Sequence, residues 1–336
     1  CRIFLCGDID TREQLKFLEE KFFSVLPPGK AAAPIALEPR WSKPRNFVVP
    51  APASQDSSPV VMISWLMGDS TDPDESLLNV LMAETLLGHD GSPLARALVD
   101  SGIGEDLAPV CGFDTNLRES LFSLGLRGVP KERIGDFEKL VFKTLGDLIR
   151  DGIPRRELEA ALLSLEFSVR EIRRAHGPFS LVYLRRAMRA WLHGKHPAST
   201  LCVRDRLSAL RKRLENEENL LEGLIKKTLI DNPHRSLVEI VPDQELAARE
   251  ERELAERLAK RCAAMSSQER ARLQREAIEL KAAQEAVESP EQLSCIPHLS
   301  RADLKASIET IPQSLSAVSR IPTVIHTVHT NGISYI

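Results

Sequence analysis

The chain has 336 residues, of which 43% are hydrophobic and 28% charged, and its formal net charge is −3. This length allows two domains with apolar cores, and the composition is that of a globular protein. The nearly balanced charge gives no reason to expect a nucleic-acid partner, and no apolar run is long enough for a membrane span. Six scattered cysteines without CxxC pairs are typical of reduced thiols, so we expect a reducing compartment.

The first part of the chain predicts a strand, a helix and a linker. Residues 1–6, CRIFLC, have the apolar content of a buried strand, and Thr11 is placed to cap a helix that runs to Phe23 and ends at Pro27-Pro28-Gly29. Residues 30–59 are rich in Ala, Pro and Ser, which indicates a linker with one extended segment at 46–49. A chain that opens inside an apolar run favours a piece of a longer polypeptide.

The central part has the element order of an α+β domain. Residues 60–68, VVMISWLMG, predict a central strand, and Asp72 with Pro73 after it predicts the start of a helix for which Gly88 is a natural end. The remaining elements expected here are a helix at 92–100, strands at 108–115 and 120–128, helices at 130–150, 155–174, 178–192 and 204–229, and a strand at 236–241. This order predicts a mostly antiparallel sheet with helices packed on one face.

The last part is helical and then irregular. Residues 244–288 contain neither Gly nor Pro, and Ser266 and Glu269 have the spacing of a capping box, so we expect a long antiparallel helical hairpin. Residues 289–336 read as a linker followed by TVIHTVHTNGISYI, in which Asn331-Gly332 predicts the turn of a β-hairpin.

The residues themselves predict no active site. Neither HExxH nor HxxEH occurs, and GxSxG, GxxxxGK[ST] and GxGxxG are also absent. Gly194 and Pro197 make a solvated loop the better interpretation of His193 and His196, while His326 and His329 fall on opposite faces of an expected strand. Cys111 is expected to be a small core residue rather than a nucleophile. We therefore expect no catalytic residue and no metal site in this chain.

Three stretches in a fixed order resemble one known family. They are IFLCGDIDTREQLKFLEEKF, SWLMGDSTDPDESLLNVLMAETLLGHDGSPLARALVDSGIG and the helical segment 244–288, and HTVHTNGISYI follows as a fourth. Together they resemble the middle of a pitrilysin/insulinase-type zinc metallopeptidase of the presequence-protease (falcilysin-like) branch. The resemblance implies these parts: 1–29, the closing strand and helix of a catalytic-type domain; 30–59, a linker; 60–243, a non-catalytic α+β domain; 244–288, the hairpin that joins the two halves; 289–336, a linker and the first strands of the next domain.

The resemblance also implies a function. The parent protein would be a zinc metalloendopeptidase that degrades short unstructured peptides, of the targeting-peptide type, in a closed chamber. Its zinc ligands would lie outside this chain, whose partners would be peptide substrates and the remaining parent domains. The compartment would be the cytoplasm, or the mitochondrial matrix or a plastid in a eukaryote. Two alternatives stay open: a catalytically inactive family member that acts as an assembly subunit, and a free-standing adaptor that binds partners through residues 244–288.

One loop carries the only site expectation. In relatives that degrade insulin, the segment at the place of residues 88–92 resembles an exosite that holds substrate main chain, which implies substrate contacts by Gly88, His89, Gly91 and Ser92. Glycines allow another backbone to approach closely. The alternative is that these residues form only a helix end and a turn with an exposed histidine.

Overall fold

The computed structural model describes residues 2–27, 29–30, 33–53, 57–172, 177–304, 307–308 and 310–336. It divides into two compact units, one of Cys1–Pro242 with Thr330–Ile336 and one of Asp243–His329. The predicted helix end at Pro28 and the end of the predicted helix at 173–174 lie outside the described residues.

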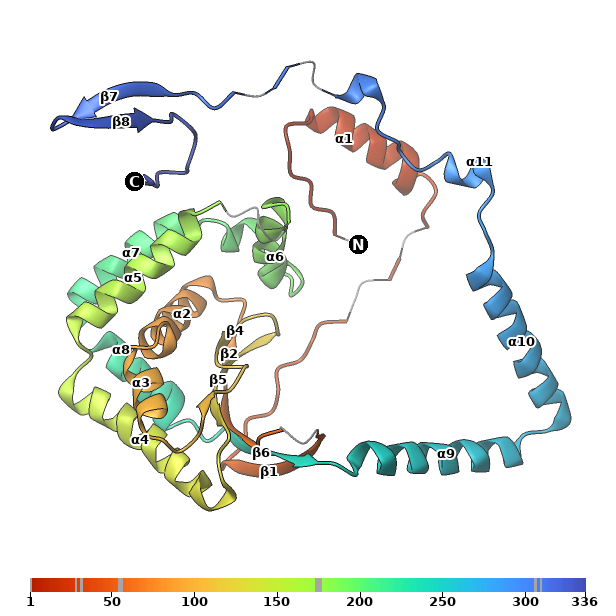
Figure 1. Cartoon of the computed structure of the whole chain (residues 1–336), viewed down its shortest axis with the longest axis horizontal. Helices are drawn as coiled ribbons and strands as arrows, with labels where there is room; N and C mark the ends of the chain where they lie inside the picture. The colour runs from red at the N-terminus through yellow and green to blue at the C-terminus, as the bar shows by residue number, and fades with distance from the viewer. Residues whose placement is uncertain are drawn as a thin grey trace. The chain divides into compact units, whose positions relative to one another are not determined.

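The larger unit is built on a six-stranded sheet (Figure 1). Its strands are β1 (Arg45–Pro52), β2 (Val60–Asp69), β3 (Asp106–Leu107), β4 (Gly112–Asp114), β5 (Glu119–Arg127) and β6 (Arg235–Asp243). They lie in the order β1-β6-β2-β5-β3, and β4 also pairs with β5. The central strand β2 pairs antiparallel with both β5 and β6, and a register shift interrupts its pairing with β5 between Leu66 and Asp69. The predicted, mostly antiparallel sheet is confirmed.

Helices cover one face of this sheet (Figure 1). They are α2 (Pro73–Leu87), α3 (Pro93–Asp100), α4 (Ile134–Asp151), α5 (Arg155–Arg170), α6 (Ser180–Trp191), α7 (Val203–Asn216) and α8 (Leu220–Ile225). Val61, Ile63 and Trp65 alternate along β2 and are fully buried, because successive side chains of a strand point to opposite faces. The indole N–H of Trp65 donates to the Leu229 carbonyl at 2.9 Å, so the core side chain has a partner for its polar atom. The α+β class is confirmed.

The start of α2 follows the sequence signals. The Asp72 carboxylate accepts the backbone N–H groups of Asp74 and Glu75 at 2.9 and 3.0 Å, and Pro73 occupies the first helical position. Proline costs nothing there because that N–H has no partner inside the helix. Seven of its fifteen residues are buried, including Leu78, Leu81, Met82 and Leu86.

Two expectations for the first residues are wrong. Residues 2–6 form no strand, because a strand needs a partner strand, and no described residue pairs in this way with the exposed segment. The cap of the following helix, α1 (Thr11–Leu18), is Asp10 rather than Thr11, since its carboxylate accepts the N–H groups of Arg12 and Glu13 at 2.8 and 3.2 Å. The helical course continues through a π-helical turn at Glu19–Phe23, as the sequence predicted.

Of the strand expected at 108–115, the structure forms only β4, and the two-residue strand β3 lies just before that range. Pro109 has no N–H to give to the ladder, and Gly112 adopts a φ of +117°, so the chain leaves the edge of β5 and returns to it. The pairing that remains is short, with two residues of β3 and three of β4 along β5.

The segment expected to be a linker is partly bound to the sheet. Its extended residues form the edge strand β1, next to β6. Before this strand, the Arg40 guanidinium and the Glu38 backbone N–H both contact the Glu119 carboxylate at 2.6 Å, and Glu119 is only 6% exposed. The ring of Trp41 stacks on His234 with 4.2 Å between centroids. These contacts attach residues 38–52 to the domain.

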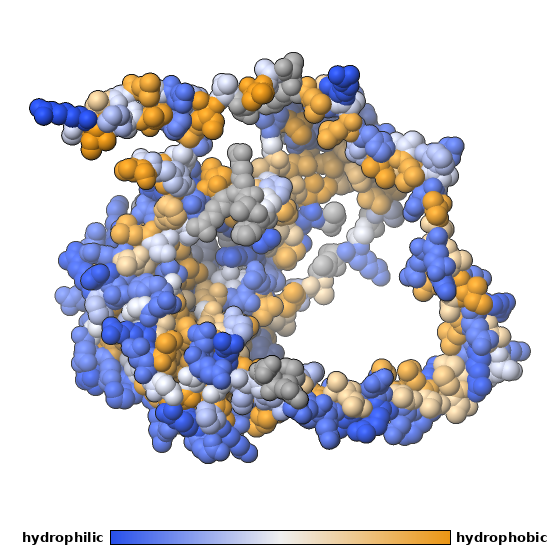
Figure 2. All heavy atoms as spheres, in the orientation of Figure 1, coloured by the Kyte–Doolittle hydropathy of each residue, from blue (hydrophilic) through white to orange (hydrophobic). Residues whose placement is uncertain are grey.

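The smaller unit contains two helices joined by a short turn. They are α9 (Leu246–Ala264) and α10 (Ser267–Glu285), and the Ser266 hydroxyl accepts the Glu269 N–H at 3.2 Å, as the capping-box spacing predicted. The two helices diverge at the turn instead of lying side by side (Figure 1). Apolar side chains of both helices are exposed, among them Leu258 and Leu280. Figure 2 shows hydrophobic residues along this part of the chain. The side-chain contacts between the helices lie at the turn, where Arg261 approaches Glu269 at 3.6 Å and Arg270 donates to the Cys262 carbonyl at 2.6 Å.

The hairpin at the end of this unit lies earlier in the chain than expected. Strands β7 (Ser314–Val318) and β8 (Ile321–Ile325) pair antiparallel around Ser319 and Arg320, which have φ of +49° and +70°. Asn331 and Gly332 do form a turn with positive φ, but no strands flank it among the described residues. His326 and His329 therefore follow β8 rather than lie within a strand.

Candidate functional site

The candidate loop, residues 88–92, connects α2 to α3. Gly88 ends α2 in right-handed conformation, with φ −64°, and donates its N–H to the Glu84 carbonyl at 2.8 Å. A larger residue would not fit at this position, because a Cβ would lie 2.4 Å from that oxygen. The left-handed residue expected at the end of α2 is therefore absent, and Gly91 also lies outside the residues of positive φ that the structure describes.

Hydrogen bonds close the loop on itself. The His89 N–H donates to the Ser92 hydroxyl at 3.1 Å, and the Ser92 N–H donates back to the His89 carbonyl at 2.8 Å. The Gly91 N–H donates to His89 Nδ1 at 3.1 Å. All four predicted residues thus use their backbone N–H groups within the loop or with α2. The carbonyl oxygens of His89 and Ser92 are also engaged, by the N–H groups of Ser92 and Arg96. A substrate backbone would therefore have to use the other carbonyl oxygens of the loop, and it would have to displace an internal bond to gain a donor.

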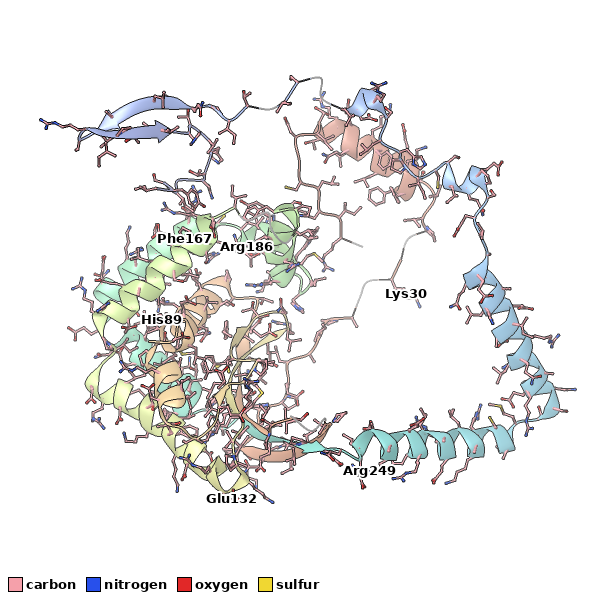
Figure 3. The ribbon with its side chains drawn as sticks, in the orientation of Figure 1. Lys30, His89, Glu132, Phe167, Arg186 and Arg249 are labelled. Atoms are coloured by element: carbon pink, nitrogen blue, oxygen red, sulfur yellow. The ribbon has the colours of Figure 1, made fainter. Side chains whose placement is uncertain are left out.

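The imidazole of His89 has a partner at each ring nitrogen. Since Nδ1 accepts from Gly91, the neutral ring carries its proton on Nε2, which lies 3.3 Å from Glu157 Oε2 on α5. The two side chains are 53% and 24% exposed, so this pair contributes at most about 1 kcal/mol. The histidine holds the loop against α5, and this geometry leaves neither nitrogen for a metal ion. Figure 3 labels His89 in this position.

The other histidines and cysteines form no metal centre in the described ranges. No group of three or more His, Cys, Asp or Glu residues there is arranged to hold an ion. His193 lies in a turn, and His196 begins a short 3₁₀-helix, with its Nδ1 accepting the Ala198 N–H at 3.2 Å. The described part of the chain therefore does not fit the zinc that the resemblance implies for the parent protein.

Cys111 behaves as a packing residue. It is half-buried against the core, its thiol donates to the Gly125 carbonyl at 3.7 Å, and burial raises its pKa. A thiol whose pKa is raised stays protonated and is a poor nucleophile. This agrees with the interpretation of Cys111 as a small core residue.

One feature escaped the sequence analysis. A cavity of about 350 Å³ lies among α2, α5, α6, α7 and β4, and Arg186 and Arg189 of α6 line it. Two arginines three residues apart are common on exposed helices. Arg186 and Arg189 differ from such a pair only because five elements of the fold meet around them to form a cavity. None of the helices that the structure describes is long and apolar enough to cross a membrane.

Two family models match the chain, one at each end. Residues 1–165 match the model described as peptidase M16 inactive domain, and residues 240–336 match the model of a segment associated with the C group of the M16 peptidases. Together they cover most of the chain, which belongs to the M16 peptidase family and is a non-catalytic part of such a peptidase. The family resemblance drawn from the sequence is confirmed.

Two curated relatives agree with this assignment. Presequence protease 1, chloroplastic/mitochondrial, of Arabidopsis thaliana is 30% identical over 342 residues, an alignment that covers 99% of this chain and 32% of that protein. Protein HypA of Clostridium perfringens is 27% identical and covers 99% and 34%. The M16 inactive domain from Pseudomonas fluorescens aligns with a TM-score of 0.47 at 19% identity, over 70% of this chain and 52% of that one. The chain spans about a third of the length of these curated relatives.

Proposed function

We propose that the chain is a wall and linker of a zinc metalloendopeptidase that degrades short unstructured peptides, of the targeting-peptide type, in a closed chamber. The observation that carries the proposal is the alignment of 99% of the chain with a presequence protease at 30% identity. The described side chains offer no metal site, so the zinc and its ligands would come from other parts of the parent protein. This part would contribute shape and substrate contacts.

The domain has properties that suit a wall. Its sheet is held by a core in which Trp65, Phe122 and Phe137 are fully buried, and helices cover one face. A rigid layer of this kind can exclude folded proteins while it admits extended peptides. In the same proposal, residues 30–59, partly attached as β1, and residues 244–288, as α9 and α10, connect the wall to its neighbours.

We propose that the loop at 88–92 is an exosite that can offer a peptide only a few hydrogen-bonding groups. Because the N–H groups of Gly88, His89, Gly91 and Ser92 and the carbonyl oxygens of His89 and Ser92 are engaged, the loop would bind a peptide through its remaining carbonyl oxygens. A free α-amino group or the N–H groups of an extended backbone could donate to them.

The compartment is proposed from the thiols and the relatives. Five described cysteines are free, and four of them are exposed, which suits a reducing compartment. Relatives are named as chloroplastic or mitochondrial proteins in plants and animals, and others come from bacteria. We therefore place the protein in a mitochondrial matrix or plastid if the source is eukaryotic, and in the cytoplasm otherwise.

The test uses the parent polypeptide that contains this chain. Purified parent should cleave a short unstructured peptide and leave a folded protein that contains the same peptide intact. A chelator should abolish cleavage, and zinc should restore it. Equal cleavage of the free and the folded peptide would contradict the chamber, and activity that survives chelation would contradict the zinc mechanism.

The alternative is a parent that cleaves nothing and serves as an assembly subunit. The exposed apolar side chains of α9 and α10 favour it, because they offer surface for a stable partner. Absence of cleavage, together with co-purification of a stoichiometric partner that is lost on replacement of Leu258 and Leu280 by Ser, would support this alternative.

A further inference from the structure

The cavity beside α6 has the size and lining of a small ligand site. Its volume of about 350 Å³ lies at the lower end of the ~300–1,000 Å³ found for ligand pockets. Phe113 of β4 and apolar side chains from α2, α5 and α7 form its walls, and Arg186 and Arg189 project from α6 (Figure 3 labels Arg186). It is separate from the loop at 88–92, none of whose residues line it.

The two arginines of this cavity lack a bonded counter-ion. Among the residues that the structure describes, neither Arg186 nor Arg189 makes a side-chain hydrogen bond or an ion pair, whereas Arg206 at the same cavity is paired with Asp74. Burial lowers the pKa of both guanidinium groups, the charge of Arg186 lowers the pKa of Arg189 further, and Asp114 offsets only part of this. Guanidinium groups remain charged at neutral pH even so. Arg186 is half-buried and Arg189 is exposed, so two like charges share a space that is only partly removed from water.

Three other hydroxyl groups of the cavity are already bonded. The Ser70 hydroxyl donates to the Leu117 carbonyl at 2.6 Å, the Ser76 hydroxyl donates to the Ser70 carbonyl at 3.1 Å, and the Thr200 hydroxyl donates to the Arg186 carbonyl. The donors that remain are the guanidinium N–H groups and the Thr115 hydroxyl, and the guanidinium groups suit the paired oxygens of a carboxylate or phosphate. A ligand that satisfies them must carry an anion.

The apolar lining decides what the anion is attached to. Leu77, Val80, Leu165 and Val169 leave room for an aliphatic group beside the two arginines. A bare inorganic anion would leave the apolar lining of the cavity exposed to water. The end of a peptide instead carries a carboxylate one bond away from the carbon that bears an apolar side chain, so it could contact both the arginines and the apolar lining. We propose that the cavity binds the C-terminal carboxylate and last apolar side chain of a peptide. This ligand class rests on the proposed function, in which peptides are the substrates.

Binding to the 336-residue chain tests the proposal without any cleavage. Calorimetric titration would compare a short peptide that ends in leucine with the same peptide as a C-terminal amide, and with inorganic phosphate. The amide should bind at least about tenfold more weakly, because the lost contacts are hydrogen bonds to charged groups. Arg186→Gln and Arg189→Gln should each weaken binding of the free acid by a similar factor and leave the weak binding of the amide unchanged.

Arg185→Gln is the matched control, since Arg185 is an exposed neighbour on α6 that does not line the cavity. It should bind the free acid like the unchanged protein. Circular dichroism would verify that every variant is folded, and Arg186→Lys provides a second variant that keeps the charge but loses paired contacts. Equal affinity for acid and amide, phosphate binding as tight as the peptide, or equal loss with Arg185→Gln would each overturn the proposal.

The outcome is distinguishable from that of the proposed function. If the parent cleaves peptides but the chain does not discriminate acid from amide, the cavity proposal fails and the peptidase proposal stands. If the chain binds the acid through Arg186 and Arg189 while the parent cleaves nothing, the cavity proposal stands and the peptidase proposal fails.

Discussion

Replacing Gly125 by alanine tests the tightest contact of the sheet. Gly125 lies in β5 opposite Met62, and a Cβ on it would meet the Val61 carbonyl oxygen at 2.3 Å and Met62 Cγ at 2.7 Å. The first atom belongs to the backbone of the central strand, so no side-chain rotation relieves the clash. The two strands must separate locally by roughly 1 Å, and overpacking of this kind costs about 1–3 kcal/mol.

The measurement is thermal unfolding of Gly125→Ala beside Gly146→Ala. In a domain of this size, 1 kcal/mol corresponds to roughly 2–4 °C, so Gly125→Ala should lower the Tm by about 4–8 °C for a mid-range cost. Gly146 lies inside α4, and a Cβ there has no neighbour within 4 Å. Its replacement should raise the Tm by about 2–4 °C, because alanine favours a helix by up to ~1 kcal/mol over glycine. A Gly125→Ala protein as stable as the unchanged one would refute the packing argument.

The remaining predictions concern the loop, an ion pair and metal. In the parent, His89→Ala should change turnover little, while Gly91→Val should raise KM for long peptides and leave short ones unaffected; an equal effect on both lengths would leave the loop a helix end only. Burial alone would raise the pKa of Asp69, but hydrogen bonds from Arg118 and Thr71 outweigh it and lower this pKa to about 2. The stabilisation is therefore present above the unfolded pKa near 3.8 and lost as pH falls toward 2, so Asp69→Asn should cost stability at pH 7 and little at pH 2, measured by denaturant titration. Elemental analysis of the chain should find no stoichiometric zinc, and one tightly held ion per chain would contradict the account of its histidines.

Elements with strong local signals were predictable from the sequence. These signals are the carboxylate of Asp72, the fixed φ of Pro73 and the apolar run of β2. Each acts on residues close to it in the chain, so its effect can be predicted from the local sequence. Strand pairing is different, because it depends on residues far away. The apolar residues 2–6 have the composition of a strand but no partner strand among the described residues, and the role of residues 46–49 as an edge strand required β6, almost two hundred residues later.

The sites show the same division. That residues 88–92 connect two helices followed from their glycines, but the engagement of their N–H groups depends on where the Ser92 hydroxyl and the His89 ring point. The cavity at Arg186 was beyond sequence reasoning, since its walls come from segments between residues 70 and 206. That the guanidinium groups of Arg186 and Arg189 lack a bonded counter-ion among the described residues can be seen only once the positions of the residues around them are known.

The attachment of residues 38–52 also sets how far the segment before Lys30 can move. A free chain of the thirty residues 30–59 would have a root-mean-square end-to-end distance of roughly 30 Å. With the chain held at Glu38, Arg40 and Trp41, at most the eight residues 30–37 can act as a tether, and a free chain of that length would span roughly 16 Å. Effective concentration varies as about the −3/2 power of tether length, so whatever precedes Lys30 meets this domain at roughly sevenfold higher local concentration. Loss of the Glu119 carboxylate would lengthen that tether without altering a single residue of it.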